Sequence, residues 1–204
     1  MGPGTKGGST RAAIIRMALI QAMEVGLEGI SLGVLASALD LSKSGLFAHF
    51  KSKEALQLAV LEEAIETFTD KVVTPALAKP RGEPRVRALF EGKLAWLENN
   101  GSGLGCIFAA LEQEYDDRPG PVRDRLVQSQ LDWHGAIVKA ASLAVRERHF
   151  VEGTDPEQVA FELEGIDAAF RHRHKLIGDA SARDRATRAY DRLIADFSPK
   201  RSKH

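Results

Sequence analysis

Apolar residues recur every three to four positions along most of the chain, which is the periodicity of amphipathic helices. In the first third of the sequence the pattern predicts a helix over residues 10–25, two short helices over 31–39 and 42–50, and a longer helix from Ser52 to about Val73. The two short helices offer too little apolar surface to be stable alone. We therefore expect the first helix to brace them in a small N-terminal domain.

The second part of the chain has the same periodicity after an interruption. Pro75, Pro80 and Pro84 mark a joint, and no alternation typical of strands follows it. Helices are predicted over about 83–98, 106–116, 121–149, 155–178 and 181–197. The sequence thus predicts an all-α protein of about nine helices, with boundaries at 1–52 (an arm and the small domain), 53–198 (a helical bundle) and 199–204 (a flexible basic tail). The helix that starts at Ser52 is apolar on two sides, so we expect it to join both cores.

Residues 31–50 carry the signals of two helices joined by a tight turn. Ser31 and Ser42 are suited to cap the two N-termini, because a serine hydroxyl accepts an orphan amide of the first turn. Asp40 is suited to end the first helix, because short polar side chains tolerate left-handed backbone. The second helix begins with Lys43-Ser44-Gly45, which are small, polar or cationic. Such an N-terminus fits the DNA major groove, where amides and small side chains approach phosphates and base edges.

A larger set of positions has the spacing of a known family: Ser31, Leu35-Ala36, Leu41-Ser42-Lys43, Leu46-Phe47-Ala48-His49-Phe50 and Ser52-Lys53-Glu54-Ala55-Leu56. Through these residues the chain resembles the helix-turn-helix of the TetR (tetracycline-repressor-type) transcriptional regulators, over roughly residues 10–60. The chain departs from the family at Asp40, where glycine is usual, at Gly45, often threonine, and at Phe47, usually tyrosine. Each departure removes a polar contact or adds backbone strain, so we expect an unusual operator.

The resemblance implies which residues touch DNA. The expected contacts are Ser31, Ser42, Lys43, Ser44, Gly45, Phe47, His49 and Lys53. Among them Ser31, His49 and Lys53 match positions that contact phosphates, whereas Lys43, Ser44 and Gly45 match the groove-facing start of the recognition helix. The alternative for Phe47 and His49 is that they only pack the small domain.

The resemblance also implies that the bundle binds a ligand among its middle helices and pairs two chains through its last two. From the aromatic residues and their polar neighbours, the expected ligand contacts are Phe68, Phe90, Trp96, Phe108, Leu111, Tyr115, Trp133 and His134. The expected dimer contacts are Ile166, Phe170, Arg171, His174, Tyr190 and Leu193. Any single aromatic residue at helical spacing can equally be part of the core.

Composition narrows the cellular context. The 204 residues hold 28 basic and 28 acidic side chains, so a uniformly basic nucleic-acid coat is excluded, although residues 1–54 carry a local excess of two positive charges. The only cysteine, Cys106, cannot form an internal disulfide, which agrees with a reducing compartment. No apolar run approaches 18 residues, and the N-terminus has no signal peptide. We expect a cytoplasmic protein without a membrane partner.

The sequence offers no catalytic pattern: no nucleophile–base spacing, metal-ligand set or cofactor loop is found. The glycines of residues 99–105 lack the spacing of a phosphate-binding loop, and the acidic residues 112–117 fit a solvated helix end better than a metal site. We therefore expect no enzyme, cofactor or metal. We expect a homodimeric repressor that is released from a palindromic double-stranded operator by a small, largely apolar effector. Two alternatives stay open: a DNA-binding dimer without an effector, and a small-molecule carrier with a vestigial DNA-binding domain.

Overall fold

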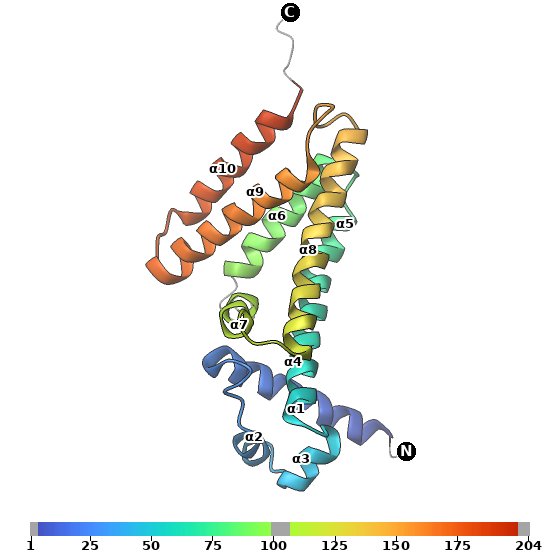
Figure 1. Ribbon diagram of the computed structural model, residues 1–204, viewed down its shortest axis with the longest axis vertical. Coiled ribbons are helices and arrows are strands. Elements are labelled where there is room, and N and C mark those ends of the chain that lie inside the picture. The colour runs from blue at the N-terminus through green and yellow to red at the C-terminus, as the bar shows by residue number, and fades with distance from the viewer. Residues whose placement is uncertain (1–3, 99–106, 200–204) are drawn as a thin grey trace, which may run out of the picture. The chain divides into compact units, whose positions relative to one another are not determined.

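The computed structural model describes residues 4–98 and 107–199, and within these ranges the chain is helical and contains no β-strand (Figure 1). This confirms the predicted all-α class. The chain forms two compact units, each built from two stretches of sequence. Unit 1 comprises Met1–Thr67 and Asn100–Ser129, and unit 2 comprises Phe68–Asn99 and Gln130–His204.

Unit 1 contains the predicted small domain. Its helices are α1 (Gly4–Val25), α2 (Leu32–Ala38), α3 (Lys43–His49), α4 (Lys53–Phe68, of which the last residue belongs to unit 2), α7 (Ile107–Tyr115) and the first part of α8 (Pro121–Arg146). The core of this unit consists of the apolar stripes of these helices, with Ile14, Leu35, Leu46 and Leu56 almost fully buried. Burial of these side chains, about 1.5–3 kcal/mol each, holds the two seven-residue helices in place.

Two helix ends of unit 1 have left-handed backbone, and that at Asp40 was predicted from the sequence. Gly26 follows α1 with φ +76°, which glycine adopts without strain. Asp40 follows α2 with φ +55°, where a short polar side chain replaces glycine. The tight turn between α2 and α3 therefore forms without the glycine that is usual there.

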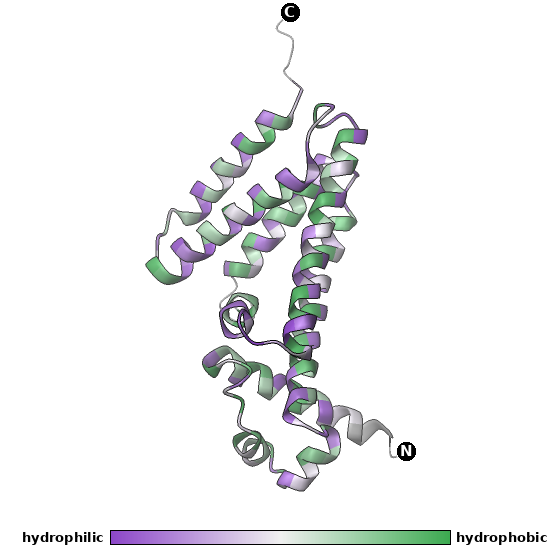
Figure 2. Cartoon of the chain, in the orientation of Figure 1, coloured by the Kyte–Doolittle hydropathy of each residue, from purple (hydrophilic) through white to green (hydrophobic). Residues whose placement is uncertain are grey.

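Unit 2 is a bundle of helices with an aromatic core. It contains η1 (Thr69–Val73), α5 (Thr74–Leu77), α6 (Glu83–Glu98), the rest of α8, α9 (Pro156–Arg171), η3 (His172–Ile177) and α10 (Ala182–Phe197), where η1 and η3 are π-helical. Helices α9 and α10 lie side by side, and polar and apolar residues alternate along α10 with the helical period (Figure 2).

Several helix ends differ from the predictions. The helix predicted over 52–73 passes through η1 into α5 and ends at Leu77, because Pro75 lies in the first turn of α5, where a missing amide is tolerated. Helix α1 begins at Gly4 instead of Thr10 and so continues through Gly7 and Gly8 despite the low helix propensity of glycine, and α8 ends at Arg146 instead of His149. Phe161 is 69% exposed because it falls outside the buried stripe of α9. Cys106, the 99–105 loop and residues 200–204 of the basic tail lie outside the described residues.

Candidate functional site

The turn between α2 and α3 is held by serine caps. Ser31 Oγ accepts the Val34 amide at 3.4 Å, and Ser42 Oγ accepts the Gly45 amide at 3.0 Å. Ser42 Oγ also lies 3.0 Å from Ser44 Oγ, so the two hydroxyls share a hydrogen bond. The caps fix the backbone of the first turn of α3 and thereby define where its free amides point.

Helix α3 has one buried and one exposed face. Leu46 is buried, whereas Lys43 and Ser44 are exposed. Phe47 is 46% exposed, so much of its ring is accessible to another molecule. His49 is half-buried at the end of the helix. The exposed face thus combines a cation, a hydroxyl and an aromatic ring around a helix N-terminus, a surface able to contact phosphates and base edges.

The turn between α1 and α2, residues 26–31, is clamped by α7. The Glu114 carboxylate accepts the amides of Leu27 and Glu28 at 2.8 and 2.7 Å, across 87 and 86 positions of sequence. The same carboxylate lies where a side chain on residue 26 would be, because a Cβ there would come within 2.7 Å of Glu114 Oε2. Gly26 is therefore required both by its φ angle and by the space that the clamp occupies.

Glu28 collects further hydrogen bonds at the same turn. Its Oε1 accepts from Gln57 Nε2 and from the Tyr115 hydroxyl, each at 3.0 Å. Lys53 Nζ donates to the Glu28 carbonyl and lies 3.7 Å from its carboxylate. Partial burial opposes ionisation of Glu28, but the hydrogen bonds from Gln57 and Tyr115 and the charge of Lys53 outweigh it and lower its pKa. Two residues expected elsewhere, Lys53 at phosphates and Tyr115 at the ligand, thus meet here.

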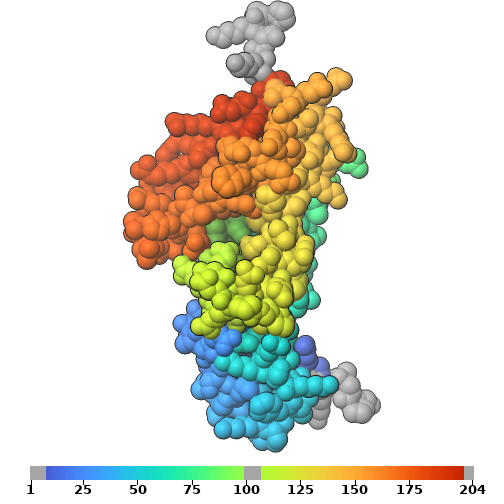
Figure 3. Space-filling model, in the orientation of Figure 1, coloured from blue at the N-terminus to red at the C-terminus, as the bar shows by residue number. Residues whose placement is uncertain are grey.

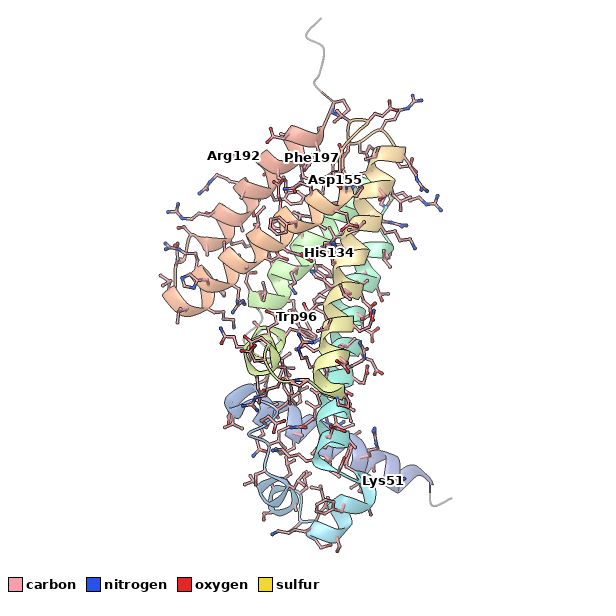
Figure 4. The ribbon with its side chains drawn as sticks, viewed as in Figure 1. Lys51, Trp96, His134, Asp155, Arg192 and Phe197 are labelled. Atoms are coloured by element: carbon pink, nitrogen blue, oxygen red, sulfur yellow. The ribbon has the colours of Figure 1, made fainter. Side chains whose placement is uncertain are left out.

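Unit 2 contains an aromatic cluster that surrounds an ammonium group. The Phe68 ring is T-shaped against both Trp96 and Trp133, with centroids 5.3 and 5.2 Å apart. Lys93 Nζ lies 4.9 Å from the Phe68 centroid and 5.1 Å from the Trp133 centroid. All three rings are buried, and Trp96 on α6 is labelled in Figure 4. These distances are those of cation–π contacts.

Acidic residues of α9 border this cluster. Asp167 is only 6% exposed, and its Oδ1 has no hydrogen-bond partner among the described residues; the same holds for Trp96 Nε1. Burial raises the pKa of Asp167 to about 7, against the charge of Lys93. One turn earlier, Glu164 lies 3.2 Å from His134 Nδ1, and Glu157 lies 2.6 Å from its Nε2. The hydrogen bond with Glu157, and then that with Glu164, raise the pKa of His134.

A surface groove of about 910 Å³ follows α9 and α10, whose surfaces are orange and red in Figure 3. Ile166, Phe170 and Leu193 line it together with small and charged residues. Arg192, also of the lining, extends outward from α10 (Figure 4). The groove therefore combines apolar surface with charged groups.

Other residues expected at interfaces lie deeper or on flanks of unit 2. Tyr190 is 0% exposed and stacks on Phe90 with centroids 4.4 Å apart, so its own chain covers both rings. Arg171 and His174 are half-buried, and the His174 ring stacks on Phe170 at 5.2 Å. Tyr190 and Phe90 thus act as core residues, without surface to offer another molecule.

Two family models match the chain. The family model "Bacterial regulatory proteins, tetR family" matches residues 14–60, and "Tetracyclin repressor-like, C-terminal domain" matches residues 82–190. Together they cover well over half of the sequence. The chain belongs to the TetR family. It is therefore a DNA-binding transcriptional regulator with a helix-turn-helix and a helical C-terminal domain.

Solved TetR-family structures have the same fold. A regulator from Cytophaga hutchinsonii has a TM-score of 0.80 at 22% identity, covering 97% of this chain and 98% of that one. A regulator from Chloroflexus aurantiacus has a TM-score of 0.81 at 20% identity, covering 93% and 94%. AibR in complex with isovaleryl coenzyme A and operator DNA has a TM-score of 0.71 at 21% identity, covering 93% and 98%. No curated protein matches the chain significantly.

Other chemistry finds no support in the described ranges 4–98 and 107–199. They contain no group of three or more His, Cys, Asp or Glu side chains placed to hold a metal ion. None of their helices combines the length and apolarity needed to cross a bilayer. No relative with an enzymatic activity is among the matches that define the family.

The expected site residues of this TetR-family chain fall into both units. Ser31, Ser42, Lys43, Ser44, Gly45, Phe47, His49 and Lys53 lie in unit 1, as do three expected ligand contacts, Phe108, Leu111 and Tyr115. Phe68, Phe90, Trp96, Trp133 and His134 lie in unit 2.

Sequence reasoning missed four polar residues that the fold brings into use: Glu28, Lys93, Glu114 and Asp167. Only Asp167 carried a signal, because it is an acidic residue at helical spacing between Leu163 and Phe170, on the apolar stripe of its helix. The other three look like ordinary surface charges in the sequence.

Proposed function

We propose that this TetR-family regulator is a homodimeric repressor that leaves a palindromic operator when a small, largely apolar effector binds. The observation that carries the proposal is the exposed, capped N-terminus of α3, with Lys43 and Ser44 accessible and Leu46 anchored in the core. An N-terminus held in this way presents free amides, a hydroxyl and a cation to duplex DNA at no further ordering cost.

The proposed DNA contacts have two roles. Ser31, His49 and Lys53 bind phosphates and set the register, whereas Lys43, Ser44 and Gly45 enter the major groove. A Cβ on Gly45 would come 3.2 Å from Ser42 Oγ, so this position offers backbone, and no side chain, to a base. Phe47 supplies apolar contact, for which the methyl group of thymine is the natural partner. Two copies of α3 would lie in successive major grooves about 34 Å apart.

A second copy of the α9–α10 face is the proposed dimer partner. Ile166, Phe170 and Leu193 would contact the partner through the groove, with Arg171 and His174 beside it. Tyr190 supports this face from below through its stack on Phe90. The apolar lining gives the pair a core, and the charged groups of the groove give it a polar rim.

The proposed effector site is the aromatic cluster of unit 2. It has the composition of ligand sites, which are mostly apolar with few polar groups. The structural neighbour AibR is described in complex with both isovaleryl coenzyme A and operator DNA, which supports a ligand-responsive regulator. Phe68 is the last residue of α4, so a ligand at this ring acts on the end of a helix whose first residue, Lys53, follows the helix-turn-helix. Differential affinity of the effector for two positions of α4 would shift DNA binding.

Operator selection from random duplex DNA, followed by gel shifts with the full chain, tests the proposal. We expect a palindromic site whose affinity falls steeply with salt, and Lys43→Ala should weaken binding and lower the salt slope by about one. Lys139→Ala is the matched control, since it removes the same charge from an exposed position on α8. Failure to enrich any site, or binding insensitive to salt and to Lys43→Ala, would refute the proposal. A thermal-shift screen then separates it from a regulator without an effector.

A further inference from the structure

The aromatic cluster of unit 2 already holds an ammonium group, its own. Lys93 Nζ lies against the faces of two rings, Phe68 and Trp133, at 4.9 and 5.1 Å from their centroids. Aromatic faces carry negative partial charge and attract cations, most strongly where water is excluded. Both rings are buried, so the cluster is shaped and polarised for a cation, and lysine is a side chain long enough to leave it.

A buried carboxyl group with one unsatisfied oxygen lies within electrostatic reach of Lys93. Asp167 is 6% exposed, and its Oδ1 has no hydrogen-bond partner in the part of the chain that the structure describes. Lys93 is the cation whose charge acts on it. Buried carboxylate oxygens are normally compensated by a partner, so an unsatisfied one near a cation-binding surface favours a cation from outside the protein, which acts through its charge and, if it is an amine, also through a hydrogen bond.

We propose that the effector of this regulator carries an amine or quaternary ammonium group, which displaces the Lys93 ammonium from the faces of Phe68 and Trp133 and lies beside Asp167. The inference rests on the proposed function, because it assigns a chemical class to the effector. An apolar tail on the same ligand would pack against the cluster's rings. Lys93 acts as the internal stand-in that keeps the cluster filled in the absence of effector.

The opposite class, an anionic effector bound by Lys93 and by the unpartnered Trp96 Nε1–H, fits less well. An anion would lie against aromatic faces of like partial charge and near the carboxyl group of Asp167. The two classes predict opposite effects for the same substitutions. Removing the Lys93 charge should tighten the binding of a cation and weaken the binding of an anion. Removing the Asp167 charge should weaken the binding of a cation and tighten the binding of an anion.

The test measures binding of defined probes to the full chain without DNA. Hexyltrimethylammonium and hexylamine are compared with hexanoate and hexanol, at pH 8, by quenching of tryptophan fluorescence. The chain has only two tryptophans, Trp96 and Trp133, so the signal reports on the cluster. We expect saturable binding of the cations, tightened several-fold by Lys93→Met and weakened about tenfold or more by Asp167→Asn. Lys139→Met, on the exposed face of α8, should leave both affinities unchanged.

Three results would overturn the inference: no saturable binding of either cation, preference for hexanoate with loss on Lys93→Met, or equal effects of Lys93→Met and Lys139→Met. Unchanged circular dichroism melting of each variant shows that a lost affinity is not a folding defect. Operator binding is measured separately by gel shift. A chain that binds its operator but no cation refutes only this inference, whereas one that binds cations but no DNA refutes the proposed function.

Discussion

The carboxylate of Glu114 clamps the α1–α2 turn, and its removal gives a quantitative test of how unit 1 is held together. Glu114→Ala deletes two charge-assisted hydrogen bonds, to the amides of Leu27 at 2.8 Å and Glu28 at 2.7 Å. The Glu28 amide is exposed and can bond to water instead, whereas the Leu27 amide is partly buried. A hydrogen bond to a charged group contributes about 1.5–3 kcal/mol, and the hydrated amide recovers part of its share, so we expect a local loss of about 2–3 kcal/mol.

Amide hydrogen exchange in the full chain measures this loss where it occurs. A change of about 2–3 kcal/mol corresponds to roughly 30- to 150-fold faster exchange at Leu27. The Phe50 amide, which bonds to the Leu46 carbonyl in α3, should keep its protection. Glu112→Ala, an exposed position on the same helix, is the control for the lost charge. Exchange at Leu27 within threefold of the parent protein, or acceleration equal to that of Glu112→Ala, would refute the clamp.

Three further outcomes follow from the same structure. Gly26→Ala should destabilise unit 1 by at least about 1–2 kcal/mol in thermal melts, because its Cβ clashes with the Glu114 carboxylate and its φ of +76° is strained for alanine. Adding Glu114→Ala removes the clash but not the backbone strain, so the double variant should keep part of the loss. Asp167→Asn should raise Tm at pH 8 and change it little at pH 4. The pKa of Asp167 is about 7 in the folded chain and ordinarily 3.8, so the parent protein loses stability as pH rises between those two values. His134→Gln should lower Tm at pH 5.5 more than at pH 9. Because the pKa of His134 is raised in the folded chain, its protonated ring stabilises the fold fully below the unfolded pKa of 6.5, and this stabilisation is lost as pH rises through the folded pKa. A Tm difference independent of pH would count against each of the two titration arguments.

The sequence by itself determined the features that depend on near neighbours. Helix caps at Ser31, Ser42 and Ser52 bond to amides three residues ahead, so their spacing is visible in the chain. The left-handed turn at Asp40 follows from a single residue type. The apolar stripes gave the helices and the all-α class, because a period of 3.6 residues is a local property.

Only the tertiary structure decided how the charged residues are used. Lys53 is a proposed phosphate contact, and in the fold its ammonium also donates to the Glu28 carbonyl, 25 positions away. Glu114 looks like a solvated helix end, yet it clamps a turn 87 positions earlier in the chain. Lys93 of α6 and Asp167 of α9 act on each other beside rings from two other helices, Phe68 of α4 and Trp133 of α8. Spacing within one helix determines on which face of the helix a side chain lies. Which residue that side chain contacts depends on which other helix packs against this face, and the packing of helices is set by burial of the whole core.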